Sequence, residues 1–119
     1  MNIIFGDAIK NIPEHFIVLE LDTFRSPAGN KTATAYCLVE SVALDEFATL
    51  ESYKKIHADL IKYYKQRQWN YCESAIQGLM GRWRGEVDSF YQDLLARVVA
   101  YKQNEPEADW DGSRLKLDI

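Results

Sequence analysis

The chain has 119 residues, of which 47% are hydrophobic, and its 14 basic and 18 acidic side chains give a formal net charge of −4. A chain of this length is the size of one domain and buries enough surface to fold without a metal or a disulfide. The composition is too apolar for a disordered chain, and no apolar run approaches the roughly 20 residues that span a bilayer. The N-terminus lacks the pattern of a secretory signal, so we expect a single-domain, soluble, cytoplasmic protein (residues 1–119) without a membrane partner.

The first part of the chain, residues 1–43, predicts β-structure. Residues 15–24 and 32–42 are rich in β-branched and aromatic types and alternate with a period of two. The segment SPAGN at residues 26–30 predicts the turn of a β-hairpin between them. Each strand is expected to place one apolar set on one face. These sets are Ile17, Leu19 and Leu21 on the first strand, and Ala33, Ala35, Cys37 and Val39 on the second.

A two-stranded hairpin is marginally stable alone, so the fold needs another partner for it. Residues 2–5 (NIIF) are an available third strand, and residues 6–13 predict a short helical turn that ends before Pro13.

The helical part, residues 44–104, predicts three helices with apolar stripes at helical spacing. The first runs to Arg67, the second from about Asn70 to Trp83, and the third follows Gly85. The fold class is therefore α+β, with an N-terminal hairpin followed by three helices, of which the first two form an antiparallel pair. In the polar tail, residues 105–119, Trp110 is too large an apolar group to be idle and is expected to pack back on the helices.

Charge is unevenly distributed along the chain. Residues 1–53 have a net charge of −5, residues 54–84 of +5, and residues 85–119 of −4. A basic segment between acidic ends can meet a phosphate backbone or an acidic partner. Alternatively, it packs near its own acidic ends or is simply a solvated helix face. We favour this structural interpretation, because helices often carry charge on the solvent side.

The histidine and cysteine side chains, which often act in enzyme active sites, are better explained here as parts of the hydrophobic core. His57 lies in an apolar helical stripe, where a core histidine is the more common role, and Cys37 and Cys72 lie on apolar stripes as small hydrophobes. No phosphate-binding glycine loop, CxxC, HExxH or GxSxG motif is present. We therefore expect no enzyme activity, cofactor or metal.

A carboxylate cluster is the one alternative that stays open. Glu20 and Asp22 share a strand face, and Glu40 joins them if the hairpin pairs as predicted. Such a cluster can hold a divalent cation, although charges that protect a sheet edge explain it more simply.

The segment LIKYYKQRQWNYCESAI resembles a tetratricopeptide helix pair, in which aromatic side chains flank a tight turn and a small residue permits close approach. Here Tyr63, Trp69, Cys72 and Ile76 are the matching positions. Residues 60–112 as a whole resemble the helical tail of class III adenylate and guanylate cyclases. The counterparts are Trp69, Phe90, Leu94, Tyr101, Pro106, Trp110, Asp111 and Gly112. The resemblance implies no cyclase activity, since too few residues precede the helices for a catalytic domain. The segments FIVLELDTF and RQWNYCESAI also resemble small proteins of marine T4-like phages.

Two functions follow from these features. The first is a non-catalytic protein-interaction or assembly module that binds a protein partner or forms a homodimer. The second is a nucleic-acid accessory protein that uses the basic, aromatic middle segment, although the acidic overall charge argues against it. The candidate binding residues are Tyr63, Tyr64, Lys65, Arg67, Trp69, Arg82, Trp83 and Arg84. Whether the basic side chains form one exposed face discriminates between the two functions.

Overall fold

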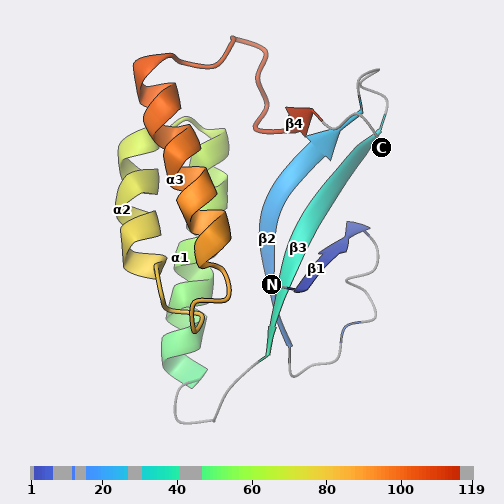
Figure 1. Cartoon of the computed structure of the whole chain (residues 1–119), viewed down its shortest axis with the longest axis vertical. Coiled ribbons are helices and arrows are strands. Elements are labelled where there is room, and N and C mark those ends of the chain that lie inside the picture. Colours follow the sequence, from blue (N-terminus) through green and yellow to red (C-terminus); the bar gives the residue numbers. More distant parts are fainter. Residues whose placement is uncertain (1, 7–11, 13–15, 27–30, 41–46, 116–119) are drawn as a thin grey trace. The chain divides into compact units, whose positions relative to one another are not determined.

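The computed structural model describes residues 2–6, 12, 16–26, 31–40 and 47–115. It divides into two compact units, each described below by itself (Figure 1). The sheet unit comprises Met1–Ser41 together with Asp111–Ile119, and the helical unit comprises Val42–Trp110. The predicted α+β class is confirmed, with a three-stranded antiparallel sheet followed by three helices.

The sheet unit has the strand order β1-β3-β2-β4. Its strands are β1 (Asn2–Phe5), β2 (Phe16–Arg25), β3 (Thr32–Glu40) and β4 (Arg114–Leu115). The hairpin of β2 and β3 is antiparallel as predicted, and NIIF is its third strand. The two-residue β4, which no periodic pattern announced, pairs parallel to the end of β2.

The register places the two predicted apolar sets on the same face, because directly opposed residues of antiparallel strands point to the same side. Leu19 lies opposite Cys37 and Ile17 opposite Val39, and Leu19, Cys37 and Val39 are all buried. A β-bulge interrupts the register between Glu20 and Thr23.

The connections between the strands are only partly described. Ser26 donates its backbone N–H to the Lys31 carbonyl at 2.9 Å, which closes the loop. The predicted SPAGN turn itself and the short helical turn at residues 6–13 fall largely outside the described residues.

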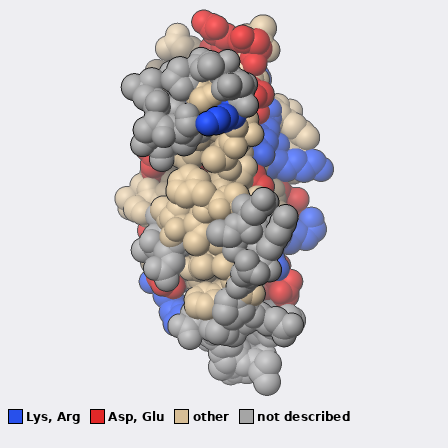
Figure 2. All heavy atoms as spheres, turned by 90° about the vertical axis from the view of Figure 1, so that its right-hand side faces the viewer, with Lys and Arg blue, Asp and Glu red and all other residues tan. Residues whose placement is uncertain are grey.

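The opposite face of the three antiparallel strands carries half-buried apolar side chains rather than buried ones. Ile4, Val18, Tyr36 and Leu38 lie on it by their register. Figure 2 is the view from the side on which β1 and β3 lie in Figure 1. Uncharged side chains fill a central band there, and most charged ones lie toward the margins.

The helical unit consists of α1 (Phe47–Lys65), α2 (Trp69–Leu79) and α3 (Asp88–Gln103), which run alternately up and down in Figure 1. Their apolar stripes meet in one core. Its most deeply buried members are Leu60, Ile76, Leu79, Trp83, Val87, Tyr91, Leu94 and Val98. Cys72 brings α2 close to α1, with its Sγ atom 4.0 Å from the Leu60 carbonyl oxygen, as expected of a small residue in a tight helix pair. Within the described residues, no helix is both long enough and apolar enough to cross a membrane.

The prediction that the second helix continues to Trp83 is wrong, because α2 ends at Leu79. Gly81 and Gly85 both have φ +78° and Arg84 has φ 55°, so the backbone turns repeatedly before α3. Glycine adopts this left-handed conformation without the steric cost that other residues meet. The side chain of Asp88, in the first turn of α3, accepts the Gly81 N–H at 2.8 Å.

His57 is a buried core histidine, as predicted, and it takes part in a polar contact inside the helical core. Its Nδ1 atom lies 2.8 Å from the Tyr91 hydroxyl, which also accepts the indole N–H of Trp83 at 3.0 Å. All three side chains are at most 2% exposed. The contact joins α1, α3 and the turn before α3.

Candidate functional site

Five of the seven basic side chains of the middle segment lie in two groups, and the other two, Lys54 and Lys55, lie in the first half of α1. Lys62, Lys65 and Arg67 lie at the C-terminal end of α1, whereas Arg82 and Arg84 follow the C-terminal end of α2. The eleven residues of α2 separate the groups by roughly 16 Å along the helix.

The turn between α1 and α2 is built around Arg67. The Gln68 N–H donates to the Tyr63 carbonyl at 3.0 Å, and the Arg67 N–H donates to the Tyr64 carbonyl at 3.1 Å. This pair of bonds is the Schellman motif, whose left-handed residue is usually glycine. Arg67 adopts that conformation with φ 62°. A residue with a side chain pays about 1–2 kcal/mol for it, so the arginine side chain is expected to contribute something that glycine lacks.

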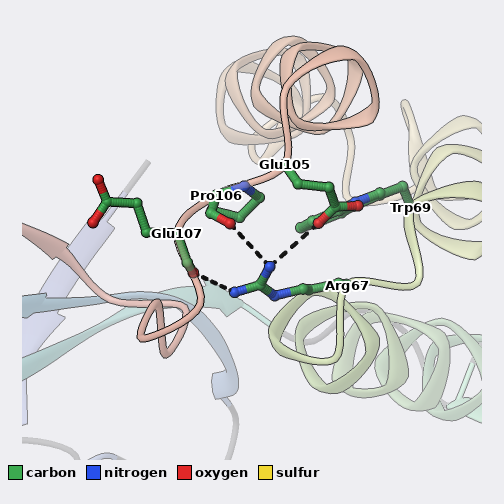
Figure 3. Close-up of polar contacts among 5 residues, drawn as sticks. All are labelled: Arg67, Trp69, Glu105, Pro106 and Glu107. Carbon is green, nitrogen blue, oxygen red and sulfur yellow. Dashed lines mark hydrogen bonds and ion pairs between the residues drawn. The ribbon is translucent and has the colours of Figure 1, made fainter.

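The Arg67 side chain holds the segment that follows α3 (Figure 3). Its Nη1 atom donates to the Pro106 carbonyl at 3.0 Å, and its Nη2 atom donates to the Glu107 carbonyl. Two successive main-chain carbonyls are thus bound by one guanidinium group. A planar fork of donors is suited to this arrangement, and a lysine ammonium is not.

A carboxylate completes this contact. Glu105 accepts a hydrogen bond from the Trp69 indole at 2.8 Å, and its second oxygen lies 3.3 Å from Arg67 Nη1 (Figure 3). The main-chain bonds hold the backbone just before a turn, in which the Glu107 carbonyl also accepts the Trp110 N–H at 3.0 Å, and the shared carboxylate selects an acidic side chain. We call Arg67, Trp69 and the carboxylate and carbonyl groups that they bind the arginine clamp.

Beside the clamp, four aromatic rings form one cluster. Every pair among them has ring centroids between 5.3 and 6.4 Å apart. The four are Tyr64, Trp69, Tyr101 and Trp110. Trp110 therefore packs on the helices, which confirms that prediction.

Two guanidinium groups lie over the faces of this cluster. Arg67 lies 5.5 Å from the ring centroid of Trp110, and Arg97 lies 5.6 Å from that of Tyr64. Cations over aromatic faces are attracted by the ring quadrupole. The residues Glu105–Trp110 are consequently held at both ends, by the clamp and by the aromatic cluster.

A cleft of about 280 Å³ adjoins the clamp. It is lined by Arg67, Gln68, Trp69, Asn70 and Lys102. Lys102 is paired with Glu73 and Arg67 with Glu105, so each of the two cations that line the cleft already has a carboxylate partner.

The structure brings three of the predicted site residues together and disperses the others. Tyr64, Arg67 and Trp69 meet in the clamp and its aromatic cluster. Tyr63 packs instead on Tyr71, with ring centroids 4.6 Å apart. The remaining predicted residues lie elsewhere: Lys65 is exposed on the last turn of α1, Trp83 is buried in the core, Arg82 lies over Tyr53, and Arg84 is exposed.

Sequence reasoning did not assign Glu105 or the carbonyls of Pro106 and Glu107 to the site. The charge pattern contained a partial signal, because Glu105 belongs to an acidic end, and packing of the basic segment near its acidic ends was one of the two structural interpretations of that pattern. Main-chain carbonyls leave no trace in a sequence, since every residue has one.

The two cysteine thiols and the strand carboxylates, which the sequence offered as candidates for chemistry, have structural roles in the fold. Cys37 and Cys72 are buried, and burial raises the pKa of the Cys72 thiol to about 11, so it is a poor nucleophile. Asp22 lies 3.8 Å from Arg114, and the Glu40 side chain is outside the described part of the chain. Within that described part, no three His, Cys, Asp or Glu side chains gather as a metal site.

The Trp-Asp-Gly element is divided between the two units. Trp110 belongs to the helical unit, while Asp111 and Gly112 belong to the sheet unit. The Ser113 hydroxyl and N–H both donate to the Asp111 carboxylate, which lowers the pKa of Asp111. Gly112 supplies the left-handed turn between them, with φ 91°.

No family model, curated protein or solved structure matches this chain. The likeness to tetratricopeptide pairs, to cyclase tails and to phage proteins therefore stays a prediction.

Proposed function

We propose that the protein is a non-catalytic protein-interaction and assembly module, and that the clamp end of its helical unit binds acidic segments. The observation that carries the proposal is the double hydrogen bond from Arg67 to two successive main-chain carbonyls. Protein modules recognise extended peptides through such main-chain bonds and take specificity from pockets for individual side chains.

The specificity would come from the two ends of the bound segment. The Glu105 carboxylate is bound by the Arg67 guanidinium and the Trp69 indole, and the Trp110 ring packs in the aromatic cluster. A ligand for the same groups is a peptide with an acidic residue about five positions before a tryptophan and a turn just before that tryptophan. The chain's own residues 105–110 occupy the site, and a partner segment would replace them.

Because the chain's own segment occupies the site, a partner peptide must compete with it. A segment tethered close to its site has an effective concentration in the millimolar range. A partner peptide must therefore bind more tightly than the resident segment, or the resident segment must first be weakened. Self-association belongs to the same proposed assembly role.

The test uses the whole chain with its resident segment weakened by Glu105→Ala and Trp110→Ala. A fluorescent peptide of residues 104–111, NEPEADWD, is titrated with this variant and with the wild type, and anisotropy is measured. We expect binding to the variant, and at least tenfold weaker binding to the wild type, whose site is already filled. Glu105→Ala alone, at an exposed side chain, is a milder variant that preserves the aromatic cluster.

The matched controls exploit the two left-handed arginines. Arg67→Gly removes the clamp and relieves its backbone, while Arg84→Gly makes the same change of charge and conformation at the other end of α2. In the weakened background, Arg67→Gly is expected to reduce peptide affinity at least tenfold and Arg84→Gly to leave it unchanged. A folded variant that fails to bind, or equal effects of the two glycines, would contradict the proposal.

A further inference from the structure

The resident segment, Glu105–Trp110, is one part of the connection between α3 and β4. The whole connection, from the end of α3 to the start of β4, consists of residues 104–113. While the clamp and the aromatic cluster hold the segment, only residues 111–113 lie between the last held residue, Trp110, and β4. Release of the segment leaves the connection unbound over its full length.

The three residues before β4 have a defined conformation of their own. The N–H and the hydroxyl of Ser113 both donate to the Asp111 carboxylate, the N–H at 2.9 Å. Gly112 between them adopts the left-handed conformation with φ 91°, and Gly112 and Ser113 are both buried. This short turn leaves little conformational freedom between Trp110 and the start of β4.

The strand β4 is too short to pair stably without help from the chain that precedes it. Its two residues lie opposite Phe24 and Arg25 at the end of β2. Arg114 lies 3.8 Å from Asp22, but its side chain is 44% exposed, and ion pairs at the surface contribute little. Because strand pairings of so few residues are marginal, the pairing of β4 depends on how closely the preceding chain confines it.

We propose that the clamp and β4 are coupled, so that a partner peptide that displaces the resident segment also releases β4 from β2. The coupling is reciprocal, because two linked equilibria change each other by the same factor. Release of β4 therefore makes the resident segment easier to displace, and the partner peptide then binds more tightly. The inference rests on the function proposed above and adds the regulation of the same site.

Loop entropy gives the size of the coupling. The cost of closing a flexible loop grows roughly as 1.5RT times the logarithm of its length. With the segment held, the loop that closes when β4 pairs is residues 111–113, and with the segment displaced it is residues 104–113. The ratio of these two lengths, raised to the power 1.5, gives a coupling factor of about six.

The first measurement is the anisotropy of the fluorescent peptide of residues 104–111. The pairing of β4 is removed by Arg114→Pro together with Leu115→Pro, because proline has no backbone N–H to donate. In the otherwise wild-type chain, this proline pair should tighten peptide binding about sixfold. The matched control is the same proline pair in the Glu105→Ala, Trp110→Ala background. There the resident segment no longer competes, so the affinity should stay unchanged.

The second measurement is hydrogen exchange of backbone amides, and it needs no peptide. In the Glu105→Ala, Trp110→Ala variant, the amides of residues 114–115 should exchange about sixfold faster than in the wild type. Those of residues 17–19, in the hairpin of β2 and β3, should keep their rates. Glu105→Ala alone keeps the aromatic cluster and should shift the same amides in the same direction by less, which keeps the test decisive if the double variant does not fold.

Two results would overturn the coupling and leave peptide binding by the clamp intact. One is equal exchange of residues 114–115 in the wild type and both variants. The other is a proline pair that changes peptide affinity by the same factor in both backgrounds. A peptide that binds neither background would instead overturn the proposed function, and the exchange of residues 114–115 would then decide by itself whether the clamp and β4 are coupled.

Discussion

At the residue scale, Cys72 shows what close helix packing requires. It is 0% exposed and its sulfur lies against the Leu60 carbonyl, so a larger side chain would force α1 and α2 apart. The same dry surroundings raise the pKa of the Cys72 thiol from 9.0 to about 11, because burial disfavours the thiolate.

The raised pKa of Cys72 predicts a loss of stability at alkaline pH. The folded chain holds the proton more tightly than the unfolded chain, so this contribution is complete below about pH 9 and is lost as the pH rises toward 11. The free energy of unfolding should fall across this range by on the order of 2 kcal/mol more in the wild type than in Cys72→Ala. Urea denaturation at several pH values measures it, and parallel pH profiles of the two proteins would contradict it.

At the element scale, the hydroxyl of Tyr91 joins three parts of the helical unit. It accepts the Trp83 indole N–H and contacts His57, while the rings of His57 and Tyr91 meet edge to face with centroids 5.7 Å apart. Inside a core, a polar contact of this kind specifies how the helices pack, because an alternative packing would leave a buried donor without its acceptor.

Tyr91→Phe tests this contact. The substitution keeps the ring but removes the acceptor of the buried Trp83 N–H, which should cost about 1–3 kcal/mol of unfolding free energy. Tyr71→Phe is the control, since Tyr71 is 38% exposed and its change should stay within about 0.5 kcal/mol. Equal stabilities of the two variants, measured by denaturant titration, would show that the hydroxyl contributes nothing.

The segment Glu105–Trp110 acts as an element although it has no regular structure of its own. The Pro106 and Glu107 carbonyls accept hydrogen bonds from Arg67, and the Glu107 carbonyl also accepts the Trp110 N–H at 3.0 Å. The Trp110 side chain completes the aromatic cluster. A helix or strand satisfies its carbonyls internally or through a neighbouring strand, whereas the Pro106 carbonyl of this segment is bound by one side chain, and the Glu107 carbonyl by that side chain and by one turn. That dependence is why a partner peptide could exchange with it.

At the scale of the whole molecule, the helical unit is inserted into the sheet unit. The chain leaves the sheet unit after Ser41 and returns to it at Asp111, where β4 pairs with β2. Unfolding of residues 42–110 would turn an ordered connection into a long flexible loop between β3 and β4. Closing such a loop costs entropy, so the helical unit supports the pairing of β4.

This insertion predicts that both units unfold in one transition, as expected of the single domain. All three tryptophans, Trp69, Trp83 and Trp110, belong to the helical unit, so their fluorescence reports on it alone. Cys37 is buried in the sheet unit, and its labelling by a thiol reagent in a Cys72→Ala background reports on the sheet. The two probes should give coincident denaturation midpoints. Midpoints that differ clearly would show two independent domains.

Local pattern was sufficient for most of the fold. The period-two alternation of residues 15–24 and 32–42 predicted β2 and β3 and an apolar set on each, and the helical stripes predicted α1 and α3. Local pattern did not predict the places where the backbone leaves regular helical or strand conformations. The early end of α2 depends on left-handed residues at Gly81 and Arg84, and the two-residue β4 is too short to have a period.

For the candidate site, the sequence by itself determined which side chains were available. It identified Tyr64, Arg67 and Trp69 as candidates and placed Trp110 on the helices. Only the tertiary structure decided what they do together. Hydrophobic periodicity reports the direction of a side chain from its own element, but the clamp is made of main-chain carbonyls almost forty residues away from Arg67. Which carbonyls meet a guanidinium group depends on how the helices and the following segment pack, and no local pattern records that.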